Sequence, residues 1–276
     1  MKNRTFQYVV DSSTSQMKTT KRGLPQGSAL SPLLFNIMML DLPYVDNVEV
    51  LDFADEIAIT VTAKTIEEAG DSIERAIRAL EDWTRQWSLT INPQKTKAMC
   101  FTKQKVMDRL PTFRIEDEDI LWVRKFSYLG VTLDAPTLTW REHVEEICRE
   151  GNQRLNIMRA LAGSSWGADR QLLINVYVTY IRSKLLYGIS AVASASKTSL
   201  YRLERIQSAA IRIAVGARST SPIKALQVEA NVLPLREFIK GTCCKTFFRM
   251  NSHDHPIIES IKEDENVKDK IWIKIS

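Results

Sequence analysis

The sequence predicts an α+β fold in which a small antiparallel sheet precedes an array of helices. Apolar and polar side chains alternate between Val48 and Val61, as in paired strands, whereas apolar side chains beyond Thr139 recur every three or four residues, as in amphipathic helices. The run Asp134-Ala135-Pro136 separates the two patterns. The expected divisions are a sheet domain over 1–135, a helical domain over 136–250 and a C-terminal tail over 251–276.

The charge of the chain is unevenly distributed. The net charge is +5, but lysine and arginine outnumber aspartate and glutamate 15 to 8 over residues 141–240, against 17 to 19 over 1–140 and 6 to 6 in the remainder. Such a basic segment is typical of proteins that hold a polyanion, and the alternative is a solvated helical face. The sequence has no apolar run of transmembrane length, no signal peptide and no metal-like cysteine spacing. We therefore expect an intracellular protein, cytoplasmic or nuclear, with reduced cysteines and no contact with a membrane.

The N-terminal segment is predicted to be a strand pair followed by a loop. Residues 5–10 and 16–22 are the predicted strands, joined by a polar turn. The loop at 23–30 has the sequence GLPQGSAL, in which Gly23 and Gly27 would let a ligand approach the backbone closely. A tight connector of the same composition would bind nothing, so both readings stay open.

A helix is expected to begin at Pro32 and to include the apolar run at 33–40. Ser31 as N-cap and Pro32 at the first helical position would start it, because the first turn needs no amide donor at the proline. Pro43 is expected to end it.

Two adjacent carboxylates, Asp55 and Glu56, stand at the tip of a predicted β-hairpin, between the alternating runs 48–53 and 57–61. A solvated tip usually carries glycine or asparagine, whereas these side chains present the anionic oxygens that Mg²⁺ prefers. The alternative is an ordinary solvated acidic turn. The hairpin is therefore a candidate metal site.

Thr65 and Glu68 form a capping box, which predicts a helix from there to about Leu89. Side chains at three- and four-residue spacings are expected to form its buried stripe: Ile66, Ala69, Ile73, Ala76, Ile77, Leu80, Trp83 and Trp87.

The basic stretch at 95–97 leads into a predicted strand at 98–102, where lysines are usually solvated edge residues. Residues 111–133 are predicted to form a small antiparallel unit with an acidic turn at 116–119 and a last hairpin from Phe126.

Everything beyond Pro136 is expected to be helical. The predicted helices cover 140–162, 168–188, 198–215, a short helix with Ser221 as cap and Pro222 in first position, and 234–251. Four arginines off the apolar face of the third helix are candidates for phosphate contacts or for simple solvation: Arg202, Arg205, Arg212 and Arg218.

These stretches, in this order, resemble the reverse transcriptase of non-LTR (LINE-type) retrotransposons, particularly jockey-like and I-like elements. GLPQGSALSPLLFN at 23–36 resembles the loop and helix under the template and incoming nucleotide, and FADE at 53–56 resembles the metal-binding hairpin. INPQKTKAMCFT at 91–102 resembles the block that follows it, and FSYLGVTLD at 126–134 resembles the primer-gripping hairpin. The basic helices, including YIRSKLLYG at 180–188, resemble the thumb.

The resemblance implies the palm of a right-hand polymerase, incomplete here, followed by an all-helical thumb. It implies RNA-directed DNA polymerisation from deoxynucleoside triphosphates on an RNA template and a DNA primer, with two Mg²⁺ or Mn²⁺ ions. Asp55 and Glu56 are the implied catalytic residues and metal ligands. The residues implied for other roles are Gln26, Gly27 and Lys95 for nucleotide and template, and Tyr128, Leu129 and Gly130 for the primer grip.

The sequence departs from the family pattern at two places. The family hairpin carries two aspartates, whereas the second acid here is Glu56. The family also places an aspartate on a palm strand well before the GLPQGS loop, and the only acid before that loop here is Asp11, in a predicted turn. A missing strand is expected to leave an open sheet edge near the hairpin. We expect a missing metal ligand to lower the rate by several powers of ten.

Three interpretations follow. The chain is a fragment of a reverse transcriptase that polymerises poorly or not at all by itself, which we favour. It is instead an active polymerase whose upstream part, from the same polyprotein, lies on another chain or was lost from the predicted gene. Or it is a basic nucleic-acid-binding module derived from the polymerase, without catalysis.

Overall fold

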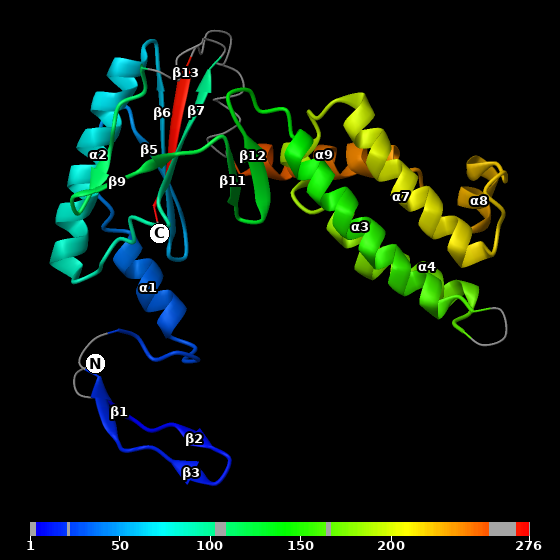
Figure 1. The fold of residues 1–276 in the computed structure, drawn as a ribbon, viewed down its shortest axis with the longest axis horizontal. Helices are drawn as coiled ribbons and strands as arrows, with labels where there is room; N and C mark the ends of the chain where they lie inside the picture. The colour runs from blue at the N-terminus through cyan, green and yellow to red at the C-terminus, as the bar shows by residue number, and fades with distance from the viewer. Residues whose placement is uncertain (1–3, 21–22, 103–108, 164–166, 254–268, 276) are drawn as a thin grey trace.

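The structure is a computed structural model that describes residues 4–20, 23–102, 109–163, 167–253 and 269–275. Figure 1 shows a sheet unit, a helical unit beside it and an N-terminal arm below, so the α+β prediction is confirmed.

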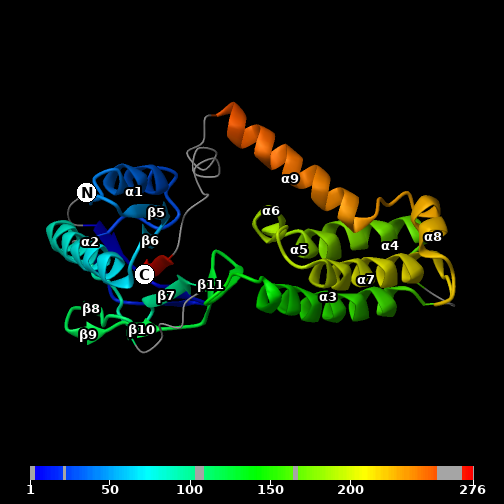
Figure 2. The same ribbon diagram turned by 90° about the horizontal axis from the view of Figure 1, so that it is seen from above.

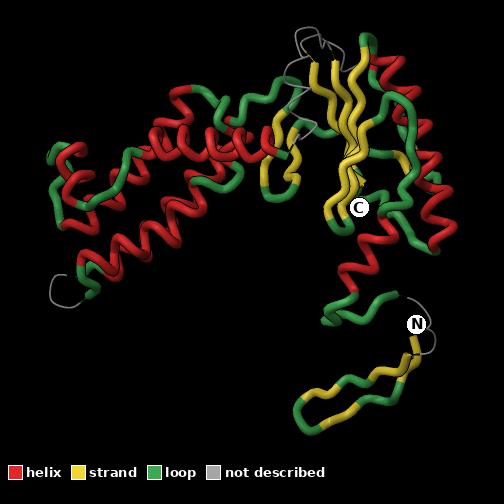
Figure 3. The backbone as a smooth tube through the Cα atoms, turned by 180° about the vertical axis from the view of Figure 1, so that it is seen from behind, coloured by secondary structure: helices red, strands yellow, loops and turns green. Residues whose placement is uncertain are grey.

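The main sheet has five strands in the order β10-β7-β13-β6-β5. Their bounds are Glu49–Phe53 for β5, Glu56–Ala63 for β6, Lys97–Thr102 for β7, Leu121–Trp122 for β10 and Asp269–Ile275 for β13. Strand β13 runs antiparallel to both β6 and β7, whereas β10 is parallel to β7. Helix α2 (Ile66–Trp87) connects β6 to β7 and covers one face of the sheet (Figures 1 and 3).

The alternation in β6 decides which face each side chain meets. Ile57, Ile59 and Val61 pack against the apolar stripe of α2, whereas Ala58 faces the opposite side together with Met99 of β7. Successive side chains of a strand point to opposite faces of the sheet, so β6 contributes side chains both to the core under α2 and to the opposite face.

The capping box at the start of α2 is confirmed, since the Thr65 hydroxyl accepts a hydrogen bond from the Glu68 amide at 3.2 Å. Trp83 is 5% exposed and lies in the core as predicted. The prediction for Trp87 is wrong, because this side chain is 45% exposed and its indole N–H donates to Asp41. The last turn of the helix extends past the sheet that would have covered it.

Strand β13 corrects one prediction. The expectation that everything beyond Pro136 is helical is wrong for residues 269–275, which form this strand. The expectation of an open edge near the acidic hairpin is confirmed at β5, which is an outermost strand of the sheet and, within the described residues, pairs with β6. The other strand of the hairpin, β6, also pairs with β13, which lies inside the sheet.

The N-terminal arm is a narrow antiparallel ribbon. Strands β1 (Arg4–Phe6) and β4 (Lys18–Thr20) pair at its base, and β2 (Val9–Val10) and β3 (Ser13–Thr14) pair at its tip. The predicted pairing of 5–10 with 16–22 is thus confirmed at the base, whereas β3 lies in the segment predicted as a turn, because the ribbon continues further toward its tip. Residues 21 and 22 of the predicted second strand lie outside the described residues. Figure 1 shows the arm below α1 (Ser31–Met39), away from the sheet.

The predicted start of α1 is wrong in one detail. Ser31 is the first helical residue and not the N-cap, because its hydroxyl donates to the Pro25 carbonyl at 2.6 Å. The helix ends at Met39, before Pro43 as expected, and Met39 is the side chain through which it enters the core.

The predicted antiparallel unit over 111–133 is divided among three places. Strands β8 (Arg114–Ile115) and β9 (Glu118–Asp119) pair with each other, and β10 joins the main sheet. Strands β11 (Lys125–Tyr128) and β12 (Val131–Asp134) form the predicted last hairpin.

The helical unit packs around its own apolar core (Figure 2). Its long helices are α3 (Arg141–Leu161), α7 (Lys197–Val215) and α9 (Leu235–Ser252), close to the predicted ranges. The shorter segments are α4 (Arg170–Val176), a π-helical turn (Tyr177–Arg182), α5 (Ser183–Leu185), α6 (Ile189–Val192) and α8 (Ile223–Glu229). Helix α8 begins one residue later than predicted, with Pro222 as its cap. Within the described ranges, no helix is both long and apolar enough to cross a membrane.

Candidate functional site

The acidic hairpin has a two-residue turn made of Ala54 and Asp55, because Phe53 pairs directly with Glu56. Ala54 adopts a φ of +54°, which replaces the glycine or asparagine usual at such a position. Glu56 is therefore the first residue of β6 and not a tip residue as predicted. Asp55 is exposed at the turn, whereas Glu56 is half-buried.

The β11–β12 hairpin lies against the face of the sheet opposite α2, where β11 packs on Ala58 and Met99. Burial raises the pKa of the Tyr128 hydroxyl, and the nearby carboxylates of Glu56 and then Asp52 raise it further. The Tyr128 hydroxyl is therefore within electrostatic range of Glu56, the first residue of β6. The candidate primer grip and the candidate metal ligands thus meet at one end of the sheet.

The tip of the β11–β12 hairpin is held by the helical unit. The Tyr187 hydroxyl donates to the Leu129 carbonyl at 2.7 Å. Gly130 has a φ of +76°, and a Cβ added there would lie 3.0 Å from the Tyr187 ring. Because a glycine and an aromatic ring fit so closely, Tyr187 fixes where the tip lies. Sequence reasoning did not single out this residue, although it stands within the YIRSKLLYG stretch.

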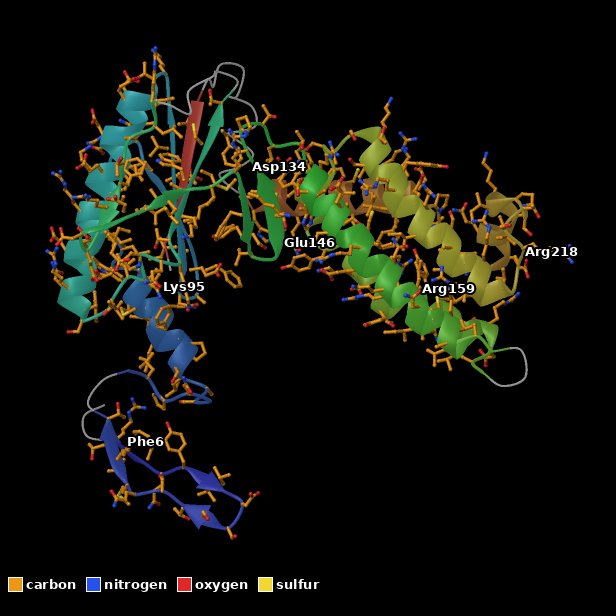
Figure 4. The ribbon with its side chains drawn as sticks, in the orientation of Figure 1. Phe6, Lys95, Asp134, Glu146, Arg159 and Arg218 are labelled. Atoms are coloured by element: carbon orange, nitrogen blue, oxygen red, sulfur yellow. The ribbon has the colours of Figure 1, made fainter. Side chains whose placement is uncertain are left out.

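Strand β12 is bound to α3 by buried polar groups. The Thr132 amide donates to His143 Nδ1 at 3.1 Å, and the Thr132 hydroxyl donates to Glu146 at 2.8 Å. Burial lowers the pKa of His143, and the Thr132 hydrogen bond lowers the pKa of Glu146. Asp134 accepts from the Trp140 amide at 2.9 Å. Figure 4 shows Asp134 and Glu146 at this junction of the two units.

Lys95 lies at the same end of the sheet as the acidic turn. Lys97 of β7 and Ala58 of β6 are both opposite Lys274 in the strand register, so the residues just before these two strands share one end. Two strand spacings separate β7 from β6, which is about 10 Å. The Lys95 side chain is exposed and has no ion pair in the described part of the chain, and Figure 4 shows it at this end.

Gln26 and Gly27 are not brought to the acidic turn. Their loop precedes α1, whose nine residues extend about 14 Å from the core (Figure 1). Gly27 has a φ of +81°, and a Cβ added there would meet no atom within 4 Å. The loop is therefore open to solvent and free of the close contacts that surround Gly130.

The carboxylates at this end fit part of a metal site. Two acidic oxygen donors suit a hard divalent ion that keeps water or phosphate ligands. Among the residues that the structure describes, however, no group of three or more His, Cys, Asp or Glu side chains comes together. The described residues therefore do not fit the pair of ions that the resemblance implies.

The predicted basic helix has two kinds of arginine. Arg202 pairs with Glu145 at 3.1 Å, and Arg212 donates to backbone carbonyls, so both are used within the helical unit. Arg205 is exposed, and Figure 4 shows Arg218 at the end of the unit far from the sheet. A groove of about 340 Å³ between α3 and α7 is lined by Cys148, Asn152, Arg202, Arg205, Ile206 and Ala209.

Comparison with known proteins shows which family the first half of the chain matches. The model of the family "Reverse transcriptase (RNA-dependent DNA polymerase)" matches residues 2–133. The chain is 26% identical to the RNA-directed DNA polymerase from mobile element jockey of Drosophila funebris, over 92% of this chain and 28% of that protein. It is 29% identical to the probable RNA-directed DNA polymerase from transposon BS of Drosophila melanogaster, over 77% of this chain and 24% of that protein. For the X-element polymerase of the same species, the identity is 26%, over 78% of this chain and 24% of that protein.

The chain thus spans about a quarter of the length of these curated relatives. No solved structure matches it. The relatives cover the helical unit as well as the sheet unit, since the jockey polymerase aligns with nearly the whole chain. Residues 2–133 therefore match the reverse transcriptase family, and over most of its length the chain is similar to the polymerases of non-LTR retrotransposons.

Proposed function

We propose that this chain is a fragment of an RNA-directed DNA polymerase that binds a primer–template duplex and, by itself, transfers nucleotides poorly. The observation that supports this most is the meeting of Asp55, Glu56, Lys95 and Tyr128 at one end of the sheet. Their places in the sequence match the metal hairpin, the following block and the primer grip of the family. In the described structure, both carboxylates come from a single hairpin.

The reaction would be attack of a primer 3′ hydroxyl on the α-phosphorus of a deoxynucleoside triphosphate, with pyrophosphate leaving. Lys95, at the same end of the sheet as the hairpin, would neutralise triphosphate oxygens. The β11–β12 tip would hold the primer end, and Tyr128 would border the acidic turn. The Asp55 and Glu56 oxygens would be the protein's share of the ligands to a divalent ion.

The geometry supports low activity. Two ions need carboxylates that converge from independent strands, because one hairpin offers ligands from one direction only. A lost ion removes several kcal/mol of transition-state stabilisation, and each 1.4 kcal/mol is about tenfold in rate. The expected loss is therefore several powers of ten relative to a complete site.

The test is primer extension on an RNA template with Mg²⁺ and then Mn²⁺, comparing the chain with Asp55→Asn and Asp82→Asn. Asp82 is the matched control, because it is an exposed carboxylate on α2, which covers the face of the sheet opposite the β11–β12 hairpin. We expect duplex binding without extension for all three proteins. Extension that disappears only in Asp55→Asn would overturn the proposal of low activity and would favour a complete active site.

A second candidate function is nucleic-acid binding without any catalysis. The groove between α3 and α7 supports it, since Arg205 stands exposed on its wall next to Asn152. Each phosphate contact contributes about 0.9 to the slope of log affinity against log salt for duplex DNA. We expect Arg205→Ala to lower that slope by about one, whereas Arg78→Ala, on the exposed face of α2, should leave it unchanged. Equal effects of both variants would exclude the groove as the binding surface.

A further inference from the structure

The central strand of the main sheet comes from the opposite end of the chain. Strand β13 pairs with β6 over its whole length, from Asp269 opposite Ala63 to Ile275 opposite Ile57. On its other side it pairs with β7 from Asp269 to Lys274. The space between β6 and β7, which we call the strand slot, therefore accepts one antiparallel strand and pairs with both of its edges.

The strand slot needs an occupant. Strands β6 and β7 lie two spacings apart, about 10 Å, so they cannot pair with each other. Ala58, Ile59, Ala98 and Met99 are at most 1% exposed, so the edges of the slot run through the most buried part of the sheet. These exposures apply with β13 in place; in an empty slot the amides and carbonyls would face water, and each lost ladder hydrogen bond would cost about 0.5–1.5 kcal/mol. An empty slot is therefore a strong site for any suitable extended segment.

The occupant is attached to the rest of the chain by a long connection. Helix α9 belongs to the helical unit, and residues 254–268 join it to β13. Fifteen residues can span at most about 50 Å. The elements that contact β13 most are β6, β7 and α2, all in the sheet unit. Among the described residues, the main contacts of β13 are thus in the sheet unit, and residues 254–268 are its covalent link to α9.

The end of α9 is exposed. Only Leu235 and Ile239 of this helix are buried, both in its first turns, whereas Phe247 is 49% and Phe248 68% exposed. The point from which the connection leaves is therefore free of the packing that would direct it to one sheet rather than another.

We propose that two copies of this chain join by exchanging β13, so that each strand slot holds the strand of the other copy. Every sheet hydrogen bond of the single chain is also present in the exchanged pair, so the two forms differ mainly in the entropy of the connection and of association. This is strand addition of the kind in which main-chain pairing supplies the affinity. The inference is independent of the proposed polymerase function.

The natural Cys100 allows a direct test, because it lies opposite residue 271 in the β13–β7 register. Directly opposite residues have Cα atoms about 4.5–5.5 Å apart, within the range for a disulfide. One full-length chain carries Ile271→Cys and Cys100→Ala, and the other keeps Cys100 and Ile271. Both carry Cys243→Ser and Cys244→Ser to remove the less buried thiols. The two are mixed unfolded, refolded together, oxidised and run on a non-reducing gel.

Exchange predicts a disulfide-linked dimer whose yield rises with protein concentration. The control replaces Trp272 instead of Ile271, since residue 272 is opposite Met99, and should give at least about tenfold less linked dimer. Light scattering on the unmodified chain should show a dimer over the same concentrations. The proposal fails if Ile271→Cys alone, with Cys100 present, gives only an internal bond in a monomer. It also fails if a folded chain gives no bond at all, because the strand is then outside the slot.

Discussion

The contact between Gly130 and Tyr187 predicts how much an added methyl group destabilises the hairpin. Gly130 and Gly216 both adopt left-handed φ angles, +76° and +64°. A side chain in this region costs about 1 kcal/mol at either site. A Cβ at Gly216 would meet nothing within 4 Å, whereas at Gly130 it would meet the Tyr187 ring at 3.0 Å. The displaced ring would also weaken the hydrogen bond to Leu129, worth about 0.5–1.5 kcal/mol.

We therefore expect Gly216→Ala to lower the free energy of unfolding by about 1 kcal/mol and Gly130→Ala by about 2–3 kcal/mol. Urea unfolding followed by circular dichroism measures both. Replacing Tyr187 by alanine should remove the extra cost, so that Gly130→Ala costs no more in that background than Gly216→Ala does. If Gly130→Ala is no more harmful than Gly216→Ala in the natural chain, Tyr187 does not hold the tip and the reasoning is refuted.

Three further predictions concern the helical unit and its junction with the sheet. Tyr177→Phe should lower the free energy of unfolding in urea by about 1–3 kcal/mol, because it removes the buried hydroxyl that donates to the Gln207 side chain at 2.6 Å. A change below about 0.5 kcal/mol, which is typical of a neutral surface substitution, would contradict this. Burial lowers the pKa of His143, so the unfolded chain binds more protons than the folded chain, and the free energy of unfolding should fall as the pH drops below about 6.5. His143→Gln should flatten this pH dependence, as measured by thermal unfolding across pH 5–8. An unchanged dependence of stability on pH in the variant would count against a role of His143. Asp134→Ala should lower the free energy of unfolding by about 1.5–3 kcal/mol, because it removes the carboxylate that accepts from the Trp140 amide at the start of α3. Amide exchange at Trp140 should quicken, and an unaltered rate would argue against the contact.

Elements with strong local signals could be predicted from the sequence. The capping box at Thr65 determines where α2 begins, because the side chain satisfies an amide that the helix itself leaves free. The hairpin around Asp55 follows from alternation on both sides of a short turn. In both cases the information lies within a few residues, so the prediction needs no knowledge of the tertiary fold.

Features that depend on distant contacts could not be predicted in the same way. No local pattern in the run Ile271-Trp272-Ile273 predicts which strands it would pair with. Trp87 has the spacing of a core residue, but the sheet does not extend far enough to cover it. Tyr187 acts on Leu129 across 58 positions of the chain, so its role appears only when the two units are seen together. The placement of Lys95 beside the acidic turn depends likewise on the order of the strands.

The position of β13 also has a consequence for synthesis on the ribosome. Strand β6 ends at Ala63 and β13 begins at Asp269, so about 200 residues separate the two partners. At about 5–20 residues per second, a nascent chain would carry β6 and β7 without their shared neighbour for roughly 10–40 seconds. During that interval the edges of β6 and β7 that later pair with β13 are exposed to chaperones and to other nascent chains on the same messenger RNA. The crowding of ribosomes on the message would then decide how often a sheet is completed by its own last strand.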